Sequence, residues 1–116
     1  MGNVRRFGRA QRVVVPLTFA TPLATDASLG DVFTVTATSS FTLSNPTNAK
    51  DGDQIEWRIR QDGTGSRVMT LDTKFRFGTD ITAATLTTTA NKTDRLGVEY
   101  HAADDKFDVV AFIKGH

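Results

Sequence analysis

The stretch Asp53-Gln-Ile-Glu-Trp-Arg-Ile-Arg-Gln-Asp-Gly-Thr-Gly-Ser-Arg67 decides the fold class of this chain. Its first half alternates apolar with polar residues, which is the pattern of a strand buried on one face only. The apolar face consists of Ile55, Trp57 and Ile59. The polar face consists of Glu56, Arg58 and Arg60. The stretch therefore predicts a strand of a β-sheet with one face in a core.

A glycine-rich run, residues 62–66, follows this strand. Its residues tolerate the positive φ angles that a tight, bulged connection needs. Arg67-Val-Met-Thr-Leu71 then has the composition of a second strand. The sequence thus predicts a β-hairpin in which residues 67–71 return beside residues 55–61.

Similar alternation continues through most of the remaining chain. Short strands are expected within residues 31–37, 39–43, 95–100 and 107–113, and the last two form a second hairpin. Residues 80–91, rich in threonine, are expected to form an exposed loop with one brief strand. The positions predicted to fill the core are Phe33, Val35, Ile55, Trp57, Ile59, Leu96, Val98, Phe107 and Val109.

The bulk composition agrees with an all-β fold. The chain has 116 residues, room for one core, and its 18 threonines and eight phenylalanines suit a pleated surface better than a helix. No window holds a helical apolar spacing over two turns. We expect an antiparallel β-sandwich or barrel over residues 16–116, preceded by an extended N-terminal arm over residues 1–15.

The final strand departs from simple alternation. Phe107, Val109, Ala111 and Ile113 would line one face, but the opposite face contains Val110 and Phe112. A strand that is apolar on both sides lies either centrally in a two-layer core or against another subunit. Both interpretations stay open, and Val110 and Phe112 are the candidate residues of a subunit interface.

Charge is unevenly distributed along the chain. Residues 1–25 contain Arg5, Arg6, Arg9 and Arg12 but no acidic residue, whereas the remainder has ten Lys and Arg against 13 Asp and Glu, so that 10 − 13 gives −3. A basic arm before a mildly acidic body indicates a tail that docks on an acidic surface. Phe7 adds one aromatic side chain to this arm. The alternative is a terminus that serves only solubility.

Catalytic chemistry is disfavoured by what the chain offers. The only histidines are His101 and His116, and no serine lies in a Gly-x-Ser-x-Gly elbow. The carboxylate pairs Asp51/Asp53 and Asp104/Asp105 fall in polar turns, where nothing would raise the pKa of one member. We expect a protein that is not an enzyme and has no catalytic residue, no cofactor and no metal ligand, although a calcium site built from several loops stays open.

Other partner classes are also disfavoured. The chain has no cysteine, which excludes disulfides and zinc–thiolate sites. No run of eighteen apolar residues predicts a membrane span, and no secretory signal pattern is expected. Four arginines with one phenylalanine could grip a phosphate backbone, but the acidic body opposes nucleic-acid binding.

Several segments taken together resemble a β module of structural proteins in tailed bacteriophages, namely tail fibres, minor tail proteins and head-decorating proteins. The resemblance covers roughly residues 23–115. It rests on the order of short motifs: Ala24-Thr-Asp-Ala-Ser-Leu-Gly-Asp-Val-Phe33, Leu43-Ser-Asn-Pro-Thr-Asn48, Trp57-Arg-Ile-Arg-Gln-Asp-Gly-Thr-Gly-Ser-Arg67, Lys74-Phe-Arg-Phe77 and Thr87-Thr-Thr-Ala-Asn91.

The resemblance implies a β-sandwich of jelly-roll type, commonly homotrimeric, that binds or decorates without catalysis. Here the module follows a short basic arm and no fibre-forming region, which favours a capsid decoration or cementing protein on the exterior of the virion. Its arm, with Arg5, Arg6, Phe7, Arg9 and Arg12, would dock on the major capsid protein. A minor tail or receptor-binding protein that contacts the host surface is the alternative.

Overall fold

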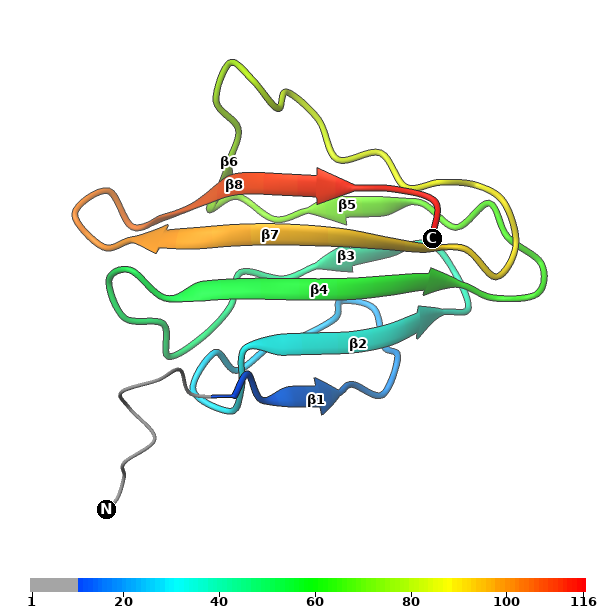
Figure 1. The fold of residues 1–116 in the computed structure, drawn as a ribbon, viewed down its shortest axis with the longest axis horizontal. Coiled ribbons are helices and arrows are strands. Elements are labelled where there is room, and N and C mark those ends of the chain that lie inside the picture. Colours follow the sequence, from blue (N-terminus) through cyan, green and yellow to red (C-terminus); the bar gives the residue numbers. More distant parts are fainter. Residues whose placement is uncertain (1–10) are drawn as a thin grey trace.

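A computed structural model describes residues 11–116, and this part of the chain is all-β and contains no helix (Figure 1). The expected fold class is confirmed to that extent. The strands are β1 (Val14–Pro16), β2 (Val32–Ala37), β3 (Phe41–Leu43), β4 (Gln54–Gln61), β5 (Met69–Leu71), β6 (Phe75–Arg76), β7 (Thr93–His101) and β8 (Lys106–Ile113).

Two sheets contain these strands. The large sheet has six strands in the order β1-β2-β4-β7-β8-β6, and the small sheet pairs β3 with β5. The expectation of an antiparallel fold is wrong in detail, because the large sheet is mixed. Four of the six described strand pairs are parallel, and only β4–β7 and β7–β8 are antiparallel.

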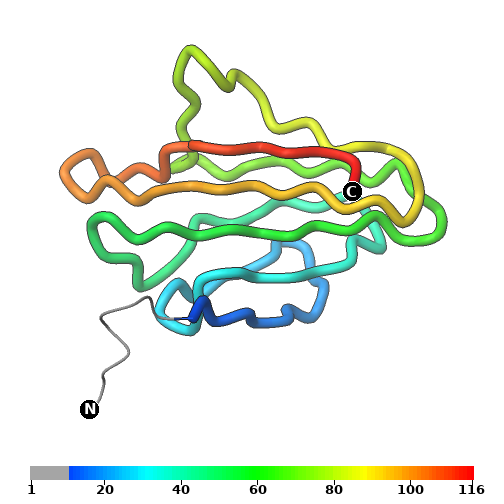
Figure 2. Tube along the Cα trace, viewed as in Figure 1, coloured from blue at the N-terminus to red at the C-terminus, as the bar shows by residue number. Residues whose placement is uncertain are grey.

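The parallel pairs require the chain to cross back between strands of the large sheet (Figure 2). The chain returns through residues 17–31 after β1, through β3 after β2, and through β5 after β4. These three returning segments run side by side. The hairpin expected between residues 55–61 and 67–71 is therefore wrong. β4 pairs with β2 and β7, while β5 pairs in parallel with β3 in the other sheet.

The C-terminal hairpin is confirmed, with a bulge that the alternation did not predict. β7 and β8 are antiparallel, and Leu96 lies opposite Phe112 while Val98 lies opposite Val109. Val110 is the extra residue at the register shift, so the phase of β8 changes there. Phe112 consequently packs against the core, and Ala111 and Ile113 move to the opposite face, contrary to the expected assignment.

The core joins residues of both sheets in one cluster. All nine positions predicted from alternation are buried, and Phe41, Leu43 and Met69 of the small sheet belong to the same cluster. Trp57 on the central strand β4 is fully buried. Its indole N–H donates to the Thr25 hydroxyl at 2.9 Å, so the one polar atom of the ring has a partner.

Buried polar side chains hold the irregular segment that connects β6 to β7. Gln61, 2% exposed, donates to the carbonyl oxygens of Arg67 at 2.9 Å and Thr87 at 2.8 Å. Asp94, also 2% exposed, accepts from the Thr87 and Gly115 amides at 2.6 and 2.8 Å. The expected exposed loop at residues 80–91 is present, but it contains no strand, and Leu86 anchors it in the core.

The predicted N-terminal arm is described only from residue 11 onward. Val14 and Val15, assigned to the arm by sequence, lie in the edge strand β1 and pair with Val32 and Phe33. The amide of Val13 donates to the Asp31 carboxylate at 2.7 Å. The folded part of the chain therefore begins a few residues before the boundary expected at residue 16.

Replacing Trp57 by alanine should lower the free energy of unfolding by roughly 3–5 kcal/mol, because it empties the centre of the core and leaves Thr25 without its donor. Urea unfolding followed by circular dichroism measures this change. Leu29→Ala, at a position 61% exposed, is the control and should leave the midpoint almost unchanged. Equal losses in the two variants would contradict the central role of Trp57.

Candidate interaction surface

The large sheet has one face toward the core and one face away from it, which we call the outer face. β3 and β5 lie behind the large sheet in Figure 1, on the core side. Strand alternation and the cross-strand registers place a set of mostly polar residues on the outer face. Around the middle and the carboxyl end of β4 they are Thr34, Thr36, Glu56, Arg58, Arg60, Thr93, Arg95, Gly97, Ala111 and Ile113, and toward its amino end the same face holds Val32, Gln54, Glu99 and Asp108.

Three arginines surround one glutamate on this face. Glu56 Oε1 accepts a hydrogen bond from Arg12 Nη1 at 3.0 Å. Its Oε2 lies 3.6 Å from Arg58 Nε and 3.9 Å from Arg95 Nη1. These two longer contacts are ion pairs without a hydrogen bond, and both Glu56 Oε2 and Arg58 Nε are buried atoms with no hydrogen-bond partner among the described residues.

The arginines outnumber their counter-charge. Arg58 lies directly opposite Arg95 in the β4–β7 pair, an arrangement that is unfavourable for like charges. Arg60, next on the same face of β4, forms no ion pair with any residue of the described chain. The outer face is therefore cationic around β4, although the body of the protein has an acidic excess.

A shallow groove runs over this cationic region. It has a volume of about 390 Å³ and is lined by Pro16, Leu17, Thr34, Val35, Thr36, Arg58, Arg60 and Thr93. A smaller hollow of about 120 Å³ adjoins Glu56 and Arg95, where Gly97 faces Ala111. Guanidinium groups and threonine hydroxyls suit an anionic ligand with hydrogen-bond acceptors.

The predicted subunit-interface residues lie on β8 but in different environments. Val110, at the bulge, is 54% exposed. Phe112 is only partly exposed, because it packs against the core. Ile113 on the outer face is 53% exposed, so the strand offers an apolar surface made by Val110 and Ile113.

The opposite end of β8 carries a network of ion pairs. Arg76 contacts Asp108 at 2.6 Å and Asp104 at 3.0 Å, and His101 lies 3.7 Å from Asp108. The Arg76 hydrogen bond holds the pKa of Asp108 below its usual value. The Arg76 guanidinium thus bridges two aspartates and ties β6 to β8 and to the β7–β8 turn.

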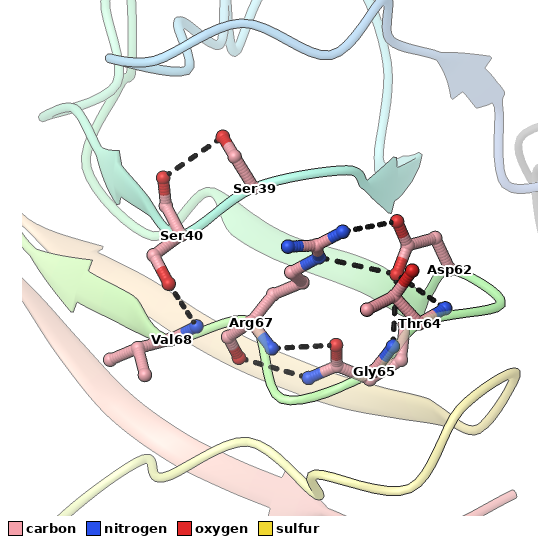
Figure 3. Close-up of polar contacts among 8 residues, drawn as sticks. Ser39, Ser40, Asp62, Thr64, Gly65, Arg67 and Val68 are labelled. Atoms are coloured by element: carbon pink, nitrogen blue, oxygen red, sulfur yellow. Dashed lines mark hydrogen bonds and ion pairs between the residues drawn. The ribbon is translucent and has the colours of Figure 1, made fainter.

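A second ion pair rigidifies the glycine-rich connection after β4. Figure 3 shows the Arg67 guanidinium folded back onto Asp62, with contacts of 3.2 and 2.8 Å. The Asp62 carboxylate also accepts from the Gly65 amide at 3.0 Å. The Arg67 hydrogen bond is the main cause that lowers the pKa of Asp62 to about 2. Positive φ angles at Gly65 and Ser66 confirm that this run is a tight connection.

Of the five residues predicted to dock on a partner, the structure describes only Arg12. Arg12 contributes to the outer face through its contact with Glu56. Arg5, Arg6, Phe7 and Arg9 lie outside the described residues. Sequence reasoning did not single out the cluster of Glu56, Arg58, Arg60 and Arg95 as a site, since the opposition of Arg58 and Arg95 depends on strand pairing.

The buried polar residues Gln61 and Asp94 were also missed as structural anchors. Both lie at strand positions where alternation predicts an apolar residue that faces the core. Gln61 is two residues after Ile59 in β4, and Asp94 is two residues before Leu96 in β7. A polar residue in the buried phase is the signal that could have identified them.

The described residues contain no group of three His, Asp or Glu side chains arranged to hold a metal ion. None of the elements in residues 11–116 is a helix with the length and apolarity needed to cross a membrane.

Comparison with known proteins provides no relative. No protein-family profile, no curated protein and no solved structure matches this chain.

Acid should remove the contribution of Asp62 to stability. Folding lowers the pKa of this carboxyl from 3.8 to about 2, so its ionised form stabilises the folded state above about pH 4, and the effect is lost as the pH falls toward 2. The difference in unfolding free energy between the unmodified protein and Asp62→Asn should shrink over that interval. Asp80→Asn, at an exposed position, is the control. A difference that stays constant down to about pH 2 would refute the assignment.

Proposed function

We propose that this protein is a non-enzymatic structural component of a tailed-phage virion, a decoration or cementing protein on the capsid exterior, anchored to the major capsid protein by its N-terminal arm. The sequence resemblance to structural proteins of tailed phages supports a place in the virion. The basic arm and the uncovered outer face support docking on another protein.

One observation carries the proposal. Arg12, the last arginine of the basic arm, reaches Glu56 on the outer face, beside the cationic groove. The arm therefore enters the folded domain next to a sheet face that presents exposed or half-buried arginine and threonine side chains. Arm and outer face can act as one continuous docking surface, and many copies on a lattice would make modest affinity at each site sufficient.

The finer fold and assembly are part of the same proposal. We interpret the two sheets around one core as a β-sandwich of jelly-roll type, in which returning segments form the second layer. We also propose a homotrimer with Val110 and the exposed part of Phe112 near the subunit contact. The exposed apolar surface of β8 supports this, because such a surface in a small domain commonly meets a partner.

The alternative is a minor tail or receptor-binding protein. The segment between β6 and β7 extends well beyond the edge of the large sheet in Figures 1 and 2. A protruding loop on a rigid β scaffold is a common way to present a host-contacting surface.

Deleting residues 2–11 should abolish binding to undecorated phage heads while leaving the domain folded, because Arg12 and β1 are retained. Co-sedimentation of purified protein with empty heads measures binding, and circular dichroism with thermal unfolding checks the fold. A parallel binding assay uses intact host cells. Binding to cells but not to heads would replace the decoration role by the tail or receptor role.

Val110→Asp should convert the trimer to monomers, because a carboxylate at the contact would be desolvated beside apolar side chains. Light scattering on the purified protein at micromolar concentration measures the mass. Val68→Asp is the matched control, since Val68 is 59% exposed and lies at the small sheet. A monomeric unmodified protein, or dissociation by the Val68 change alone, would contradict this interface.

A further inference from the structure

We infer that the groove on the outer face binds an acidic, extended segment of a partner protein. This goes beyond the proposed function, because it assigns the chemistry of a ligand to residues that sequence reasoning had not selected. It applies equally to a capsid protein, a tail protein or a partner outside a virion.

The charge balance of the groove calls for carboxylates. One carboxylate, Glu56, is shared among Arg12, Arg58 and Arg95, and Arg60 forms no ion pair within the described residues. Of the residues that line the groove, only Arg58 and Arg60 carry a charge, and within the described residues Glu56 is the one carboxylate paired with either of them. Glu56 already lies between Arg58 and Arg95, so a further carboxylate in the groove is attracted most strongly by Arg60, with Arg58 beside it.

The hydrogen-bonding capacity of the site is also incomplete. Glu56 Oε2 and Arg58 Nε are both buried without a hydrogen-bond partner in the described chain, and they face each other at 3.6 Å, too far for a good bond. A guanidinium binds a carboxylate best through two parallel N–H···O bonds, which Arg58 does not make with Glu56. The buried Arg58 Nε is closed to a ligand, whereas Arg60 is exposed and forms no ion pair within the described chain, so an incoming carboxylate can form that paired contact with Arg60.

The shape of the groove suits an extended chain. Arg58 and Arg60 are two residues apart on one strand, so their side chains emerge roughly 7 Å apart. A peptide with acidic residues at alternate positions has the same spacing. Thr34, Thr36 and Thr93 can hydrogen-bond to its polar groups, and Pro16 and Leu17 offer a short apolar wall.

The same residues argue against a nucleic acid. None of the residues that line the groove is aromatic, whereas sites for single strands commonly stack bases on aromatic rings. A carboxylate-bearing protein segment avoids the need for stacking and matches the small number of cations.

The test uses a fluorescein-labelled peptide of alternating Glu and Thr, titrated with the full-length protein and followed by fluorescence anisotropy. Saturable binding that weakens as salt is added is expected. Arg58→Gln combined with Arg60→Gln should reduce the affinity by about tenfold or more. Glu56→Gln should increase the affinity, because it frees the arginines from their internal competitor. A purely structural role of this cluster would not produce that increase.

The matched control is Lys50→Gln combined with Lys114→Gln, which removes the same net charge at exposed positions that do not line the groove. It should retain the affinity of the unmodified protein, and a peptide of alternating Gln and Thr should not bind. An equal loss in the lysine variant would show that only net charge matters and would overturn the assignment. So would absent binding, or tighter arginine-dependent binding of an oligothymidylate.

This experiment uses no virus particle, so its result is independent of the decoration role. If the arm deletion abolishes binding to heads but retains binding of the peptide, the arm and the groove are two separate binding surfaces. Peptide binding without any head binding would leave the groove assigned and refute the capsid location.

Discussion

Strands β2 and β4 are parallel neighbours in the large sheet, so the chain must leave this sheet after β2 and return to its starting side before β4 begins. In many proteins a helix makes such a return. Here residues 17–31, β3 and β5 make the successive returns, and they associate with one another on the core side of the sheet. The second layer of the protein is thus a direct consequence of parallel pairing in the first, and Trp57 fills the space between them.

The segments that connect the parallel strands are not helical, so some of their backbone N–H and C=O groups have no hydrogen-bond partner in a helix or sheet. Buried polar side chains take over this role, because an unpaired buried amide or carbonyl is costly. Gln61 binds two carbonyl oxygens and one amide of neighbouring segments, and Asp94 binds two amides and a hydroxyl. Both side chains reach Thr87, so the last strands, the irregular segment before them and the C-terminus form one unit.

All returning segments lie on one side, and the opposite face of the sheet is consequently left to polar side chains. The central position of β4 and β7 then concentrates Arg58, Arg60 and Arg95 around Glu56. Arg12, the last arginine of the basic N-terminal segment, lies beside this cationic outer face, and the two together are the basis of our proposal that the protein docks on an acidic protein surface. Sequence reasoning could predict the basic arm from local composition, but it could not predict the groove, which needs two strands distant in the chain.

By itself the sequence determined most of the long strands and the core-facing residues of each up to the bulge in β8, because side chains of a strand alternate with a period of two whatever its partner is. Ile55, Trp57, Ile59 and the terminal hairpin follow from this rule and from a short turn. Tertiary structure decided the parallel pairing of β2 with β4 and the separation of β5 from β4, since alternation carries no information on strand direction or partner. It also decided the bulge at Val110, because one extra residue becomes visible only against the register of the neighbouring strand.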